Sequence, residues 1–188
     1  NPATSIWLWG EGSKPNLIPF SKKYGLSGSV ISAVDLVHGI GILAGLKTVH
    51  VAGATGNINT NFRGKAQAAL DELEKGSDFV YVHIEAPDEC GHQGLMEEKI
   101  KSIEKIDSET LAFLLKGLEK WEYSLLLMPD HPTPLSIRTH SRDPVPFVIY
   151  SNKEHLSNPG LCYSERDAAA TGLYIDKGHT LMDMFLGK

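Results

Sequence analysis

The chain has 188 residues, a mass of 20.6 kDa and a net charge of −5 at pH 7. Hydrophobic residues make up 41% of it and charged residues 22%, which excludes a disordered chain and suffices for one domain with a buried core. The pI of about 5.9 argues against a nucleic-acid-binding protein, and the apolar runs are too short to cross a membrane. Two cysteines cannot form a disulfide framework, so we expect a cytoplasmic protein.

The chain begins with Asn1-Pro2, without an initiator Met or the basic region of a signal peptide. We therefore expect it to be a piece of a longer polypeptide. Repeats and low-complexity linkers are lacking in the sequence, which predicts one domain over residues 1–188.

The first half of the chain alternates short apolar runs with helical patterns. In order, these predict a strand at Ser5–Trp9, a loop at Gly10–Pro19, a strand at Gly28–Ser32, a helix at Val34–Leu46, a strand at Thr48–Ala52, and a helix at Gly64–Lys75 that ends at Gly76. The strands are mostly continuous apolar stretches without polar alternation, which is typical of strands buried on both faces of a parallel sheet.

The second half continues the same alternation. It predicts a strand at Phe79–Ala86, a helix at Met96–Leu118, strands at Tyr123–Met128 and Pro146–Tyr150, and a helix at His179–Leu186. The apolar residues of the long helix recur in steps of three and four. The fold class predicted from this order is α/β, with three αβα layers and a mainly parallel sheet.

Five side chains beside the predicted strands could hold a divalent metal ion. They are Asp88 and His92 after the predicted strand Phe79–Ala86, Asp130 and His131 after the next predicted strand, and His140 before the last one. Ligands of parallel α/β sheets bind outside the carboxyl ends of the strands, and Asp and His are good ligands for Zn²⁺ or Mn²⁺. The position of His140 at this edge does not follow from that rule, because it precedes its strand.

The spacing of these residues limits what each pair can do. Asp88 and His92 can reach one ion from a tight turn or from the first turn of a helix. Asp130 and His131 would diverge in an extended chain, so they can share an ion only if the backbone turns, which the prolines on either side favour. Singly, each residue could equally be a helix cap or a solvated group, but three such loops together favour a metal site.

Three other features could bind a ligand or take part in catalysis. The Gly53–Gly56 turn could bring backbone amides to a phosphate, although its spacing to Lys65 is not that of a Walker loop. Arg63 and Lys65 near a helix start could bind a phosphate or a carboxylate, but the residues alone favour a solvated helix face. Ser136 and Ser141 lack the base and orienting residue of a serine triad.

Five motifs can be compared with known families. They are Trp7-x-Trp9-Gly10-x-Gly12-x-x-Pro15, Ser32–Leu36, Gly53–Gly56, Glu85-Ala86-Pro87-Asp88-Glu89-x-Gly91-His92 and Pro129-Asp130-His131. In this order they resemble the archaeal-type cofactor-independent phosphoglycerate mutases of the alkaline phosphatase-like superfamily. The resemblance covers essentially the whole chain, and the stretch from Glu85 to His92 is its most specific part.

The resemblance implies an alkaline phosphatase-like fold and a glycolytic isomerase. Such enzymes interconvert 3-phosphoglycerate and 2-phosphoglycerate through a phosphoserine, with two divalent ions that could be Mn, Zn, Co or Mg. By motif position, the resemblance implies one metal ion on Asp88, His92 and His140, part of the second metal site on Asp130 and His131, and contact with the substrate at Lys65.

The family pattern also has parts that this chain lacks. The resemblance implies an upstream aspartate and the nucleophilic serine, which together complete the second metal site, and an inserted substrate domain. We therefore expect this chain to be the C-terminal part of the phosphatase-like domain, with no catalytic nucleophile of its own, one well-held metal ion at most, and no activity alone. Asn59 stands where the family more often has Asp.

Two alternatives remain open at this point. One is another metal-dependent phosphoryl-transfer enzyme of the same superfamily, such as a phosphatase or a phosphopentomutase. The other is a non-catalytic half that binds a metal or a partner and docks with a separately encoded N-terminal half, or forms a homo-oligomer. A sheet without its first strands should expose an edge or an apolar patch, and dimerisation would favour this second alternative.

Overall fold

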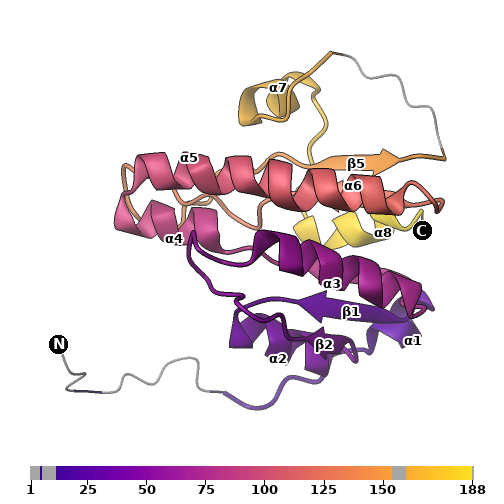
Figure 1. Cartoon of the computed structure of the whole chain (residues 1–188). Helices are drawn as coiled ribbons and strands as arrows, with labels where there is room; N and C mark the ends of the chain where they lie inside the picture. Colours follow the sequence, from indigo (N-terminus) through magenta and orange to yellow (C-terminus); the bar gives the residue numbers. More distant parts are fainter. Residues whose placement is uncertain (1–4, 6–11, 154–159, 188) are drawn as a thin grey trace.

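The structure is a computed structural model that describes residue 5 and residues 12–153 and 160–187 (Figure 1). The first part of the chain forms α1 (Phe20–Tyr24), β1 (Gly28–Ile31), α2 (Asp35–Leu43), β2 (Lys47–Val49), α3 (Phe62–Glu74) and β3 (Phe79–Val82). The three strands form a parallel sheet in the order β2-β1-β3, and α2 and α3 lie on opposite sides of β1 (Figure 1).

The second part begins with the helix that matters most for the site. It forms α4 (Ala86–Gln93), α5 (Met96–Lys105), a π-helical segment (Ile106–Leu111), α6 (Ala112–Leu118), β4 (Ser124–Leu127), β5 (Val148–Ser151), α7 (Glu165–Ala170), a 3-10 turn (Gly178–Thr180) and α8 (Leu181–Phe185). β4 and β5 pair antiparallel. No helix among the described residues is long and apolar enough to cross a membrane.

Small residues allow the layers around β1 to pack closely. Val30 and Ile31 of β1 are 2% and 0% exposed. A Cβ atom at Gly41 of α2 would lie 2.5 Å from Val30 Cγ1, so only glycine allows α2 to approach the strand this closely. On the other side, Ala66 and Ala69 of α3 are buried, and their short side chains bring this helix close to the sheet.

Most predicted elements are confirmed, with different ends. The helix predicted from Gly64 begins at Phe62, because Asn61 caps it by accepting a hydrogen bond of 2.8 Å from the Gly64 amide. Gly76, with a φ of 97°, follows its end as expected. The predicted strand Phe79–Ala86 stops at Val82, because α4 starts soon after it.

The remaining differences concern helix form and strand direction. The predicted helix Met96–Leu118 is present but contains the π-helical segment, which no apolar spacing signals. β1 has parallel neighbours on both sides, as expected, whereas β5 runs antiparallel to β4. The helices α1, α4 and α7 were not predicted. The predicted strand Ser5–Trp9 lies outside the described residues apart from Ser5.

A buried carboxylate ties α3 to β1 and β2. Glu72 is 3% exposed and accepts hydrogen bonds from Ser29 (3.1 Å), Lys47 (3.0 Å) and Lys75 (3.0 Å). The bond from Lys47 is the main cause that lowers the pKa of Glu72 from 4.5 to about 2, and burial opposes it. The ionised form therefore stabilises the folded chain.

We expect this carboxylate to govern part of the acid sensitivity of the fold. Since its pKa is lower in the folded chain, its stabilisation is complete above pH 4.5 and is lost as the pH falls towards 2. Glu72→Gln should lower the free energy of unfolding at pH 7 by about 2 kcal/mol and flatten its decline over this pH range. Urea unfolding at several pH values measures both effects, with Glu74→Gln on the same helix as control. An unchanged pH slope in Glu72→Gln would contradict this assignment.

Candidate metal centre

The site is built on α4, which begins three residues after the end of β3. Pro87 stands in its first turn, where a missing amide hydrogen has no cost, and the acidic Asp88 is favoured near the positive end of the helix. His92 follows one turn later on the same face, and its Nε2 lies 3.3 Å from Asp88 Oδ2. The predicted Asp-x3-His pair is therefore formed by a helical turn.

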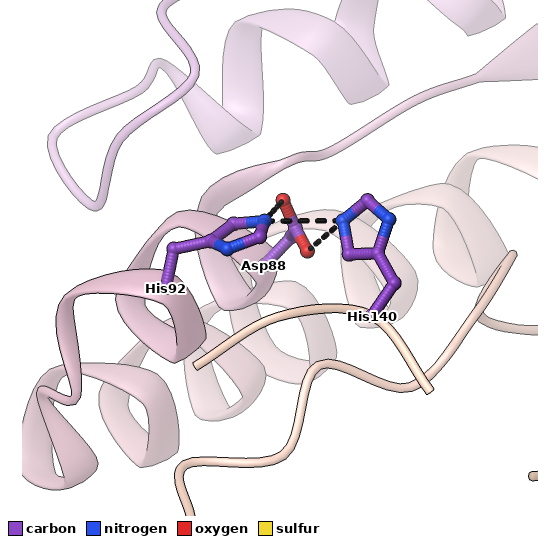
Figure 2. Close-up of side chains that lie close together, drawn as sticks. All are labelled: Asp88, His92 and His140. Carbon is purple, nitrogen blue, oxygen red and sulfur yellow. Dashed lines mark hydrogen bonds and ion pairs between the residues drawn. The ribbon is translucent and has the colours of Figure 1, made fainter. Parts of the chain in front are cut away.

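His140 reaches this pair from the loop between β4 and β5 (Figure 2). Its Nε2 lies 3.3 Å from Asp88 Oδ1 and 3.0 Å from His92 Nε2. Ligand atoms about 3.4 Å apart surround a tetrahedral ion whose bonds are about 2.1 Å long. The two imidazole nitrogens and the two oxygens of the Asp88 carboxylate thus lie close enough together to hold one divalent ion, and all three residues were predicted to share one.

The hydrogen bond on the far side of His92 prepares it for coordination. Its Nδ1 lies 3.0 Å from the carbonyl oxygen of Arg138, which can only accept, so Nδ1 carries the hydrogen and Nε2 presents its lone pair. Arg138 itself has a φ of 52°, the only positive φ of a non-glycine residue in the described parts of the chain. Such backbone strain persists where the surroundings enforce it, and here it lies directly behind a candidate ligand.

Asp130 and His131 lie beside the three-residue cluster. The His131 ring stacks on His140 with 3.7 Å between ring centres, and its Nδ1 is 4.0 Å from Asp88 Oδ1. Its Nε2 lies 3.4 Å from Asp130 Oδ2. Of the five predicted ligands, Asp88, His92 and His140 therefore form one cluster, His131 lies against it, and Asp130 adjoins His131. The prolines beside this pair do accompany a bend of the chain.

The expectation that Lys65 lies on a solvated helix face is wrong, because this side chain is buried. It is 0% exposed, and its Nζ donates a hydrogen bond of 3.2 Å to the carbonyl oxygen of His83. Burial lowers the pKa of Lys65 to about 8, with the charge of Glu85 opposing the shift. Its contact with a substrate stays a prediction.

Two residues of the site were missed by sequence reasoning. Burial, followed by the charges of Glu89 and Asp88, raises the pKa of Glu85, which lies between the site and the Gly53–Gly56 turn. Gly56 packs directly against the Glu85 carboxylate, so a side chain at this position would have to displace that carboxylate. Thr133 is 4% exposed and donates a hydrogen bond to Asp88 Oδ1. Neither contact has a local sequence pattern that could have signalled it.

A family model described as the metalloenzyme superfamily matches residues 2–187. The chain belongs to this family. A relative from Geobacter sulfurreducens, named as a probable 2,3-bisphosphoglycerate-independent phosphoglycerate mutase, is 50% identical over all of this chain and 47% of its own length. A relative from Methanosarcina barkeri, named as the same mutase, is 45% identical over 99% of this chain and 47% of its own length.

Solved structures confirm the α/β fold class of the metalloenzyme family. A protein from Pyrococcus horikoshii is similar with a TM-score of 0.85 and 30% identity, over 94% of this chain and 53% of that one. The cofactor-independent phosphoglycerate mutase from Thermoplasma acidophilum gives a TM-score of 0.68 and 25% identity, over 92% of this chain and 39% of that one. The chain thus spans about half the length of the curated relatives it matches.

Removing the charge of the central carboxylate should weaken metal binding strongly. Asp88→Asn keeps the shape of the side chain but removes the charge that the two histidines face, so we expect the affinity for Mn²⁺ to fall by about 100-fold or more. Asp143→Asn is the matched control, because Asp143 lies on the same loop as His140 and its carboxylate accepts a hydrogen bond from the Ser141 hydroxyl. Isothermal titration calorimetry of the whole chain measures both, and equal losses would contradict the assignment.

Proposed function

We propose that this chain is the C-terminal, metal-binding part of a phosphoglycerate mutase that interconverts 3-phosphoglycerate and 2-phosphoglycerate. The observation that carries the proposal is the convergence of Asp88, His92 and His140 at one point, with ligand-atom spacings that fit a metal ion. The names and identities of the relatives support the substrate. Membership of the metalloenzyme superfamily supports the use of metal.

The five clustered side chains have distinct roles in this proposal. Asp88, His92 and His140 hold one divalent ion, while Asp130 and His131 supply part of a second site. Two imidazoles with one carboxylate suit Mn²⁺, Zn²⁺ or Co²⁺ better than Mg²⁺. When bound, such ions activate a serine hydroxyl and stabilise the charge of the phosphoryl oxygens.

Lys65 has a supporting electrostatic role in this proposal. Its ammonium is buried in α3 and has one backbone acceptor, the carbonyl of His83, so its charge is only partly compensated. Glu85 is the acidic group whose charge acts on it most directly. A buried cation of this kind favours an anionic substrate such as phosphoglycerate, which we propose it contacts or attracts.

The nucleophile must come from elsewhere. The hydroxyl that contacts the metal cluster, Thr133, donates its hydrogen to Asp88 and is therefore engaged. Apolar side chains on α5 also support a further polypeptide, because Met96, Ile100 and Ile103 are 59%, 51% and 52% exposed along one side of the helix. We propose that the upstream part of a longer enzyme, similar to the relatives, covers this stripe and supplies the serine.

The proposed compartment is the cytoplasm. Both cysteines of the chain are free, Cys90 buried and Cys162 exposed. Free thiols are typical of a reducing environment such as the cytoplasm.

The chain alone should show no mutase activity, because it carries the metal ligands without a nucleophile. An enolase-coupled assay with 3-phosphoglycerate and Mn²⁺ measures this. Fusing the chain to the upstream part of the Geobacter sulfurreducens relative should restore activity, and His92→Ala in the fusion should remove it again. Turnover by the 188-residue chain alone would contradict the missing nucleophile, and a folded, metal-binding fusion without turnover would contradict the mutase.

A further inference from the structure

Thr133 connects three parts of the site that are far apart in the sequence. It lies in the loop after β4, its side chain reaches Asp88 on α4, and its carbonyl oxygen accepts a hydrogen bond of 2.8 Å from Lys99 on α5. It is 4% exposed, so water does not compete for these groups. A Cβ atom at Gly91 would lie 2.6 Å from the Thr133 carbonyl oxygen, which shows how tightly this loop is held against α4.

The hydroxyl of Thr133 can satisfy its two neighbours in only one way. A carboxylate accepts and does not donate, so the hydroxyl hydrogen is directed to Asp88 Oδ1. Only oxygen lone pairs are then left for His131, whose Nδ1 lies 3.4 Å away. In its Nδ1–H tautomer, His131 donates to this hydroxyl and keeps a free lone pair on Nε2.

In this tautomer, the unprotonated Nε2 on the other side of the His131 ring faces Asp130. Nε2 lies 3.4 Å from Asp130 Oδ2, and both atoms are then acceptors. Two acceptors at this separation repel each other unless a cation lies between or beside them. An imidazole whose other nitrogen donates a hydrogen bond is the usual form of a metal-ligating histidine.

We propose that Thr133 is a positioning residue that prepares both halves of the metal centre, a proposal that rests on the proposed function. Its donated hydrogen bond orients Asp88 towards His92 and His140. Its accepted hydrogen bond fixes the Nδ1–H form of His131, so that Nε2 and Asp130 are both free to bind metal. Lys99 holds the backbone of Thr133 in the place from which it does both.

The test compares Thr133→Val, which keeps the shape and loses the hydroxyl, with Thr133→Ser, which keeps the hydroxyl. Calorimetry with Mn²⁺ on the whole chain should show affinity about 10- to 100-fold weaker for Thr133→Val and close to wild type for Thr133→Ser. Thr110→Val is the matched control: Thr110 is 5% exposed and its hydroxyl also makes a buried hydrogen bond, to the Phe62 carbonyl, away from the metal centre. Equal affinities of Thr133→Val and wild type would overturn the proposal.

A second readout needs no metal. Long-range ¹H–¹⁵N spectra of the imidazole rings at pH 8 should show His131 protonated on Nδ1 in wild type and Thr133→Ser. In Thr133→Val the hydrogen should move to Nε2, where it can bind Asp130. If wild type binds no Mn²⁺, the proposed function fails, and the spectra still decide the role of Thr133, because an Nε2–H form in wild type would overturn it.

Discussion

The metal centre depends on the placement of the short helix α4 directly after β3. A parallel strand delivers its carboxyl end to the edge of the sheet where ligands bind, and a helix starting there fixes the distance between residues four positions apart. Asp88 and His92 therefore need no other part of the chain to face the same point. The other candidate ligands, His140 among them, have to be brought to this pair.

The loop between β4 and β5, residues 128–147, brings them there without regular helix or strand. Contacts to its backbone hold it: Lys99 donates to the Thr133 carbonyl, His92 to the Arg138 carbonyl, and the Ser141 amide to the Pro132 carbonyl. Two of these contacts come from α4 and α5, so the helix that presents Asp88 and His92 and the helix after it also fix the backbone of the loop that completes the site. A site built in this way is preorganised before any ion binds.

Sequence reasoning could predict the parts of this arrangement that are local. The strand end before Asp88, the spacing to His92 and the presence of Asp130, His131 and His140 in neighbouring loops led to a metal cluster. The structure brings Asp88, His92 and His140 together, with His131 and Asp130 beside them. The roles of Thr133 and Glu85 could not be predicted, because they arise from contacts between segments far apart in the chain.

For the fold, too, local sequence patterns predicted some elements but not how distant segments pair or pack. Apolar runs indicated β1 and β3 and their parallel direction, but a run such as that of β5 has no feature that reveals which way the strand pairs. Lys65 shows why composition alone can mislead: a lysine near a helix start is usually solvated, and only the packing of α3 against the sheet buries it. Its burial is a tertiary effect that overrides the local pattern.

The most direct test of the account is anomalous diffraction from a crystal of the chain grown with Mn²⁺. We expect a manganese peak among Asp88 Oδ, His92 Nε2 and His140 Nε2. A second acidic group in the described chain, formed by Glu85, Asp88 and Glu89, offers a competing site for a cation. A peak on Glu85 and Glu89 without the histidines, or none at Asp88, would contradict the central claim that the histidines and Asp88 form one metal centre.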